Sequence, residues 1–264
     1  MLRPGEPCGS GSRFPSERGH RVADVSVEMA MYVSGVICLA ATLQGISGFG
    51  FNMLAVPALI LVYPPQVVVP GVLMTYLPLG AGQVVQLRRD IDVRLWGTLV
   101  ASAAGALPIG ALILRHTDAA LMKPVIGTMM VLLALLLQLR PGAPLKRELG
   151  ARIGGGFISG VLAASTGVSG PPLVLLGLKQ GWHYRAFRAT LLTYFLSVSF
   201  LSLPFHWGMD LVNSTSIGFA LSGLPGLFLG FLAGTWFRNR VGGRTFRWVA
   251  VGMVMCGGLA AVIF

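Results

Sequence analysis

Two stretches of small, polar and proline residues interrupt apolar segments, and they hold the side chains best suited to chemistry. The first runs Ser47-Gly48-Phe49-Gly50-Phe51-Asn52, and the second runs Ser165-Thr166-Gly167-Val168-Ser169-Gly170-Pro171-Pro172. Glycine and proline are poor helix formers. A backbone opened at membrane depth must be buried in protein or line a water-filled cavity, because unpaired amides in hydrocarbon are costly. Two such breaks at matching places in two halves are typical of a substrate site in a transporter.

The second stretch has the residue order of a helix start, with Ser or Gly as N-cap and Pro at the first helical position. Phe51-Asn52 is expected to begin a matching half-helix. Each helix N-terminus behaves like roughly half a positive charge, so two converging ends favour a small anion. Glycines admit the ligand to the backbone, while hydroxyl and amide groups add donors. The candidate substrate-binding residues are Ser47, Gly48, Gly50, Asn52, Ser165, Thr166, Gly167, Ser169, Gly170 and Pro171.

The composition indicates the elements that position these residues. Of 264 residues 54% are apolar and only 11% are charged, and long apolar runs recur from Met29 to Phe264. Such runs predict membrane-spanning helices, and the absence of period-two alternation argues against a barrel. We expect an all-α integral membrane protein with about eight hydrophobic segments in two repeats of four, the first segment of each repeat being broken and either spanning or re-entrant.

Changes in composition divide the chain into four parts. Residues 1–28 are rich in Gly, Pro, Ser and Arg and are expected to form a disordered tail. Residues 29–139 form the first membrane repeat, 140–151 a linker loop, and 152–264 the second repeat. Small residues at spacing four predict close helix contacts in both halves. They are Ser102, Ala106 and Gly110 in the first, and Gly226, Gly230 and Gly234 in the second.

The basic loops bear on how the broken segments cross the membrane. If each broken segment spans once, the Lys and Arg residues divide almost evenly between the two faces. If each returns to its own side, the loops 88–94, 140–152, 179–188 and 238–247 share one face that holds most of the positive charge. The positive-inside rule favours the second arrangement. The halves are then inverted copies whose hairpins meet near the midplane.

Several other functions are disfavoured by the residue content. The net charge of +11 lies in short loops, so it indicates membrane orientation and no nucleic-acid partner. The three cysteines are scattered and predict neither a disulfide nor a metal site, and no cofactor is expected. No Asp or Glu lies within an apolar span, which argues against a carboxylate relay. His183 and His206 are expected to be loop histidines with structural roles.

Two alternatives to a permease remain. One is a membrane subunit that only binds a partner, in which case the breaks are packing features. The other is an intramembrane enzyme, which needs a Ser-His, Asp-Asp or His-Glu constellation within the spans, and we identify no catalytic residues. Substrate identity, transport direction, coupling ion and oligomeric state are not predicted.

At these motifs the sequence resembles the sulfite exporter TauE/SafE family of membrane permeases, over about residues 30–264. The first half offers Gly45-Ile46-Ser47-Gly48-Phe49-Gly50 with Pro57 and the loop Arg88-Arg89-Asp90-Ile91-Asp92; the second offers Gly160, Gly167 and Gly170 with Pro171 and Pro172. The glycine clusters of the family are interrupted here by Phe49 and Phe51 in the first half and by Ser169 in the second. These side chains alter the size and polarity of the expected site, and therefore bear on the substrate. The resemblance implies export or uptake of a small anion, such as sulfite, a sulfonate or a related organic acid, by a multi-pass protein of the bacterial inner membrane.

Overall fold

The computed structural model describes residues 27–47, 50–136 and 148–237, and within these ranges the chain forms helices and no strand. Five helices are long and apolar enough to cross a membrane, and Ala119–Leu132 is a shorter apolar helical stretch. The prediction of an all-α membrane protein is therefore confirmed. The final segment after Phe237, with Cys256, lies outside the described residues, as do most of the tail with Cys8 and most of the linker.

Each half begins with two helices separated by a break. The first half comprises α1 (Val27–Ser47), α2 (Phe51–Leu59), α3 (Pro65–Leu87), the 3-10 helix η1 (Arg88–Asp90), α4 (Val93–His116) and α5 (Ala119–Leu136). The second comprises α6 (Glu148–Thr166), α7 (Gly170–Gln180), α8 (Tyr184–Gly208) and α9 (Ser214–Phe237). The expected start of a half-helix at Phe51 is confirmed, and the second half-helix begins at Gly170.

Helix α8 is longer at both ends than the sequence suggests. Residues 179–188 were expected to be a basic loop and His206 a loop residue, but only Gly181, Trp182 and His183 separate α7 from α8. Gly181 ends α7 in the left-handed conformation, with φ of 65°. Polarity alone does not stop a helix, whereas a left-handed glycine does. The expectation that His206 is a loop residue is therefore wrong, since it lies in the last turn of α8.

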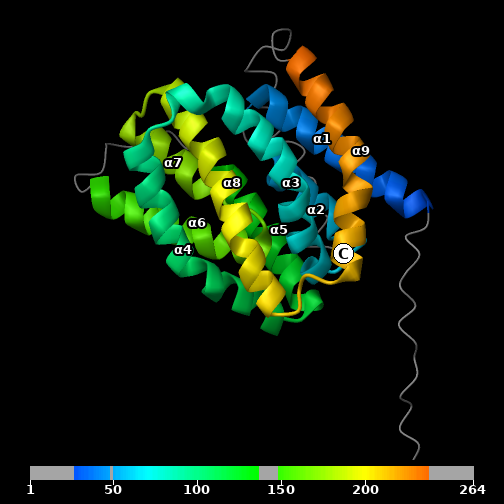
Figure 1. Cartoon of the computed structure of the whole chain (residues 1–264). Coiled ribbons are helices and arrows are strands. Elements are labelled where there is room, and N and C mark those ends of the chain that lie inside the picture. Colours follow the sequence, from blue (N-terminus) through cyan, green and yellow to red (C-terminus); the bar gives the residue numbers. More distant parts are fainter. Residues whose placement is uncertain (1–26, 48–49, 137–147, 238–264) are drawn as a thin grey trace, which may run out of the picture.

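Two helix pairs make the closest contacts: α1 packs against α9, and α4 packs against α6 (Figure 1). In α9 the glycines at spacing four face α1 directly, because a Cβ atom on Gly226, Gly230 or Gly234 would collide with its backbone. In the α4–α6 pair, Cβ atoms on Gly110 and Gly160 would meet the partner helix in the same way. The close helix contacts predicted from the small-residue spacing are therefore present, because small residues let helix backbones approach closely.

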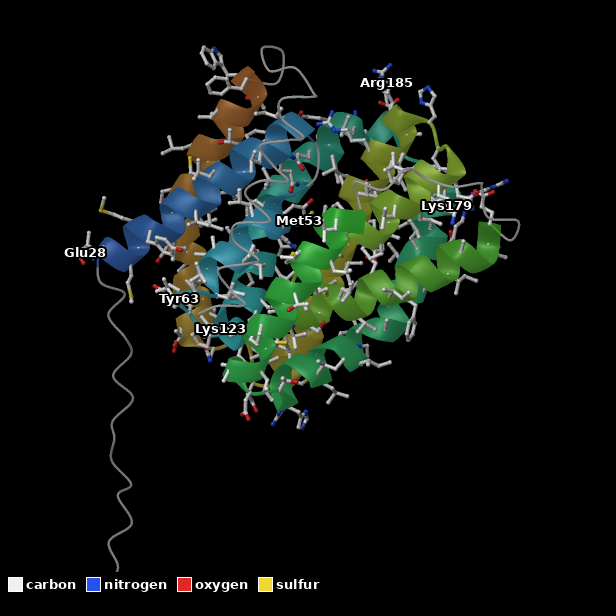
Figure 2. All side chains as sticks on the ribbon, turned by 180° about the vertical axis from the view of Figure 1, so that it is seen from behind. Glu28, Met53, Tyr63, Lys123, Lys179 and Arg185 are labelled. Carbon is white, nitrogen blue, oxygen red and sulfur yellow. The ribbon has the colours of Figure 1, made fainter. Side chains whose placement is uncertain are left out.

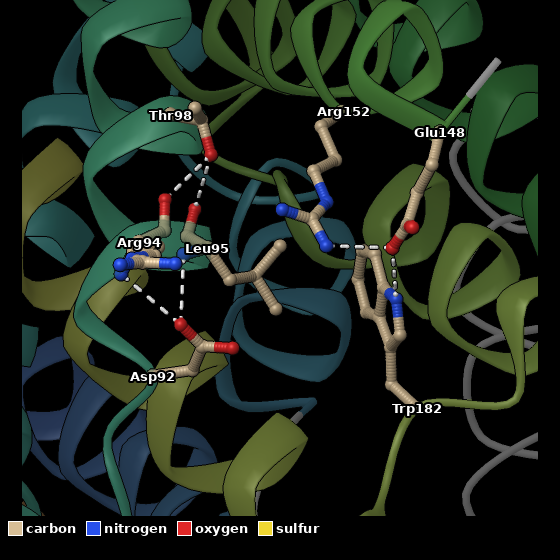
Figure 3. A network of polar contacts seen from close by, with 7 residues as sticks. All are labelled: Asp92, Arg94, Leu95, Thr98, Glu148, Arg152 and Trp182. Carbon is tan, nitrogen blue, oxygen red and sulfur yellow. Dashed lines mark hydrogen bonds and ion pairs between the residues drawn. The ribbon is translucent and has the colours of Figure 1, made fainter.

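The starts of α4, α6 and α8 gather at one end of the molecule. The amide of Asp92 donates to Thr190 Oγ1 at 3.0 Å, and Trp182 Nε1 donates to Glu148 Oε1 at 3.0 Å. Figure 3 shows Asp92 and the Glu148–Arg152–Trp182 group in one view. The basic residues Lys179 and Arg185 lie on this side of the molecule (Figure 2).

The opposite end gathers the start of α3, the end of α4 and the turn after α8. Gln66 Nε2 donates to the Thr117 carbonyl at 2.8 Å, and Arg115 lies 4.0 Å from Asp210. Tyr63 and Lys123 lie on this side, away from Lys179 and Arg185 (Figure 2). Met53, in α2, lies between the two groups in the same view (Figure 2).

Candidate functional site

A small cavity of about 30 Å³ lies where the starts of α2 and α7 meet. Both breaks contribute to its wall, together with side chains from α1, α3 and α8. The lining residues are Gln44, Gly50, Phe51, Asn52, Met53, Tyr76, Val168, Ser169, Gly170 and Phe195. Tertiary packing therefore brings together two stretches from opposite halves of the chain.

At the first break, Gly50 makes the turn into α2. Its φ of 105° lies in the region that side chains with a Cβ atom rarely adopt, so glycine is required here. Helix α2 begins at the next residue, and the carbonyl of Gly50 accepts from the Leu54 amide at 3.2 Å. The Phe51 amide is one of the amides that the helix itself leaves unpaired. It donates to Gln44 Oε1 at 3.2 Å, so a side chain of α1 fixes this end.

A buried amide and phenol network supports the first break. Gln44 Nε2 donates to Tyr76 Oη at 3.1 Å and to Gln83 Oε1 at 2.8 Å. These three side chains are almost fully buried, and they join α1 to α3. None of the three was among the site residues expected from the sequence. A glutamine within a predicted span was the available signal, because polar side chains in membrane helices usually bond across helices.

At the second break, Gly167 ends α6 in the left-handed conformation with φ of 74°, and its amide donates to the Ala163 carbonyl at 3.0 Å. Ser169 is the N-cap of α7, and its hydroxyl makes no capping bond. Proline was expected at the first helical position, but Gly170 occupies it. Because Pro171 and Pro172 have no amide hydrogen, this helix end keeps its dipole but offers fewer backbone donors than expected.

The second break is also held by a buried tyrosine. Tyr194 Oη donates to Ser159 Oγ at 2.9 Å, and Ser159 Oγ donates to the carbonyl of Ser169 at 2.6 Å. Tyr194 in α8 thus supports the start of α7 through Ser159, as Tyr76 in α3 supports the start of α2 through Gln44. Hydrogen-bonded partners make a buried hydroxyl tolerable, and they fix the backbone around it.

One side chain bridges the two breaks. Asn52, in the first turn of α2, donates from Nδ2 to the carbonyl of Gly167 at 2.5 Å. The two residues are 115 positions apart in the sequence. This bond fixes the α2 start against the end of α6, on the wall of the cavity.

The candidate residues divide into three groups. Gly50, Asn52, Ser169 and Gly170 line the cavity, and Gly167 does not line it but accepts a hydrogen bond from the lining residue Asn52. The other described candidates do not line it: the hydroxyls of Ser165 and Thr166 donate to carbonyls of their own helix, both at 2.7 Å, and Pro171 is buried in α7. Gly48 and the side chain of Ser47 lie outside the described residues.

His206 is a further buried group beside the second break. Its Nδ1 lies 2.8 Å from the carbonyl oxygen of Ser202, and its Nε2 lies 3.0 Å from that of Ala164 in the last turn of α6. The residue is fully buried. It therefore holds a carbonyl that helix α6 leaves unpaired at its end.

The chemistry of the cavity is that of a binding site for a small group. None of the described residues lining it carries a charged side chain, and no cluster of metal-ligating side chains occurs in the described ranges. Its polar groups are the backbone at the starts of α2 and α7, the side-chain amides of Gln44 and Asn52, the phenol of Tyr76 and the hydroxyl of Ser169. Such groups can orient a small polar or anionic ligand without a metal or a covalent step.

Comparison with known proteins identifies a family. No curated protein and no solved structure matches the chain. The profile described as Sulfite exporter TauE/SafE matches residues 33–261, which include both breaks and every residue lining the cavity. The protein is therefore a member of the sulfite exporter TauE/SafE family of membrane transporters.

Proposed function

We propose that the protein is a permease of the cell inner membrane that moves a small anion, such as sulfite, a sulfonate or a related organic acid. The observation that carries this proposal is the cavity at which the starts of α2 and α7 meet, bridged by the bond from Asn52 to Gly167. Membership in the TauE/SafE family supports the class of transported ion.

The charge distribution supports an anion. Two helix N-termini face the same cavity, and together they act like about one positive charge. The described lining holds no Asp or Glu to repel an anion and none to pair with a cation. A single small anion is the ligand that this arrangement stabilises best.

We further propose that residues 29–139 and 152–264 are inverted repeats whose broken segments re-enter the membrane. In such a repeat α1 corresponds to α6, and α4 corresponds to α9. Exchanging the two halves then converts the contact of α1 with α9 into a contact of α6 with α4, and both contacts are present. Tyr32 near the start of α1 donates to the Ala58 carbonyl near the end of α2, at 2.7 Å. Glu148 and Trp182 bring the outer ends of α6 and α7 together in the same way. These two contacts support re-entrant hairpins, and inverted repeats with broken helices are typical of transporters with alternating access.

The test is flux of radiolabelled sulfite into liposomes containing the purified protein, with Gly170→Leu as the site variant. A Cβ atom on Gly170 would lie 3.5 Å from Phe195 Cζ, so a leucine side chain there would occupy the space at the start of α7 that a bound anion needs. The control is Gly105→Leu, because Gly105 lies on the exposed face of α4 with nothing near its Cβ position. We expect flux in the native protein and the control, and at least about a tenfold loss in Gly170→Leu.

Two outcomes contradict the proposal. Equal flux in native protein and Gly170→Leu places the pathway elsewhere. If the folded native protein moves no sulfite, sulfonate or small carboxylate, the transport function is wrong and a partner-binding subunit is favoured.

A further inference from the structure

The buried apolar side chains of the described residues form two separate cores. One core is built from α1, α2, α3, α5 and α9, and Leu114, Val168 and Leu211 join it from outside these helices. The other core is built entirely from α4, α6, α7 and α8. Each set of helices contains one of the two closest helix contacts, α1 with α9 or α4 with α6. We call the two sets the α1–α9 body and the α4–α6 body.

These bodies are not the two halves of the sequence. Helix α9 belongs to the second half but packs with α1 and α3, and α4 belongs to the first half but packs with α6 and α8. If the halves are inverted repeats, as proposed above, exchanging them converts one body into the other. A tilt that opens the boundary between the bodies at one membrane face then has a counterpart that opens it at the other face.

Hydrogen bonds between helices strengthen each body separately. Within the α1–α9 body, Thr42 Oγ1 donates to the carbonyl of Gly230 at 3.2 Å, joining α1 to α9. Within the α4–α6 body, Trp96 Nε1 donates to Ser197 Oγ at 3.1 Å, joining α4 to α8. The networks around the two buried tyrosines, described above, also each lie within one body. Each body therefore has its own core and its own polar contacts.

The cavity lies on the boundary between the bodies. Its wall comes from α1, α2 and α3 on one side, and from the start of α7 and from α8 on the other. Phe195 in this wall packs against both cores. The bond from Asn52 to Gly167 crosses the boundary here, and the bond from Gln66 to the Thr117 carbonyl crosses it at one end of the molecule. The main helix contact across it is that of α3 with α8.

From the division of the core and the place of the cavity, and resting on the proposed function, we propose that transport proceeds by movement of these two bodies as units. They shift against each other along the contact of α3 with α8, so that α9 moves with the first three helices and α4 moves with α6, α7 and α8. A substrate in the cavity touches both bodies, which links its binding to their relative position. The close glycine contacts keep each body together, because tightly packed helix backbones do not deform continuously.

Two matched pairs of cysteines test which contacts must move, in a chain whose three natural cysteines are replaced by alanine. The boundary pair is Gly80→Cys with Leu196→Cys, because a Cβ atom on Gly80 would lie 3.2 Å from Leu196 Cδ1. The internal pair is Thr75→Cys with Gly223→Cys, because a Cβ atom on Gly223 would lie 3.2 Å from Thr75 Cγ2. Both pairs use α3, but only the boundary pair joins it to the other body.

The two cysteines of a pair are bridged with mercuric ion, which binds two thiolates because thiolates are soft ligands. Flux of radiolabelled sulfite into proteoliposomes is measured before mercury, after mercury, and after an excess of dithiol has removed it. We expect mercury to lower flux through the boundary pair by at least about tenfold, reversibly, since alternating access needs one body to move against the other. Flux through the internal pair should change by less than about twofold, since its bridge lies within one body.

Pairs of spin labels give a second measurement that does not depend on the mercury bridge. Leu221 in α9, Leu39 in α1 and Ile158 in α6 are exposed and can carry labels on cysteine. We expect sulfite to change the distance distribution between labels at 221 and 158, which lie on different bodies. The distribution between labels at 221 and 39, within one body, should stay the same.

Three results overturn the inference. One is unchanged flux through the bridged boundary pair, and another is an equal loss of flux on bridging either pair. The third is an equal effect of sulfite on the two label distances. These results differ from a failure of the proposed function, in which the native protein moves no small anion even before mercury is added; the inference then falls with it.

Discussion

The ring of His206 lies with Nε2 3.0 Å from the carbonyl oxygen of Ala164, so that α8 supports the last turn of α6 just before the second break. Its Nδ1 lies 2.8 Å from another carbonyl oxygen, that of Ser202. Both partners accept only, so both bonds form together only when both ring nitrogens carry hydrogen.

Replacement of this ring should loosen the second break. His206→Leu leaves the Ala164 carbonyl unpaired in the protein interior, and we expect it to lower the free energy of unfolding by about 1–3 kcal/mol. The measurement is thermal unfolding of the purified protein in detergent. His116→Leu is the control, since the exposed His116 contacts only a carbonyl of its own helix. Equal stability of the two variants would show that the Ala164 contact is unimportant.

The contact between α1 and α9 should be intolerant of added volume. A Cβ atom on Gly230 would collide with the carbonyl of Cys38, and backbone cannot move aside as a flexible side chain can. We expect Gly230→Ala to destabilise by about 1–3 kcal/mol through overpacking. Gly218→Ala in the same helix meets nothing near the new atom and should be neutral or stabilising, by up to about 1 kcal/mol. Thermal unfolding of the two variants gives the comparison, and a neutral Gly230→Ala would contradict the close approach of the helices.

The chain of hydrogen bonds from Tyr194 through Ser159 predicts an order of effects. Ser159→Ala leaves two buried groups unpaired, the Tyr194 hydroxyl and the Ser169 carbonyl, and should cost about 1–3 kcal/mol. Tyr194→Phe removes only one bond, while Ser159 keeps its bond to Ser169, and should cost about 0.5–1.5 kcal/mol. Unfolding by heat or denaturant ranks the variants. Ser222→Ala, which affects a bond within α9 alone, should change little. The reverse order would contradict the chain of bonds.

The Glu148 group in Figure 3 predicts a dependence of stability on pH. The Trp182 hydrogen bond and then the Arg152 hydrogen bond lower the pKa of Glu148 from its ordinary value of 4.5. A carboxyl whose folded pKa is lowered stabilises the fold above its ordinary pKa and loses that contribution as pH falls through the folded value. We expect native protein to melt slightly higher than Glu148→Gln at neutral pH. The difference should vanish in acid below the folded pKa. A difference that is constant from neutral to acidic pH would contradict this assignment.

The sequence alone determined the features that are local in the chain. Glycine, proline and serine at the two breaks predicted where helices stop and start, because backbone conformation and amide supply depend on neighbouring residues. Glycines at spacing four predicted close helix contacts, because residues at this spacing lie on one helix face. Apolar runs predicted the class of protein through the thickness of the bilayer.

Only the tertiary structure decided which of these residues meet. Asn52 donates a hydrogen bond to Gly167, 115 residues away in the sequence, and Gln44 donates one to Tyr76. Both bonds form because particular faces of separate helices pack together. Ser165 and Thr166 look like ligand donors in the sequence, but their hydroxyls return to carbonyls of α6. Helix periodicity says which residues share a face but not which face meets which partner. That choice depends on how all the helices fill space together, and it determines which polar atoms border the cavity.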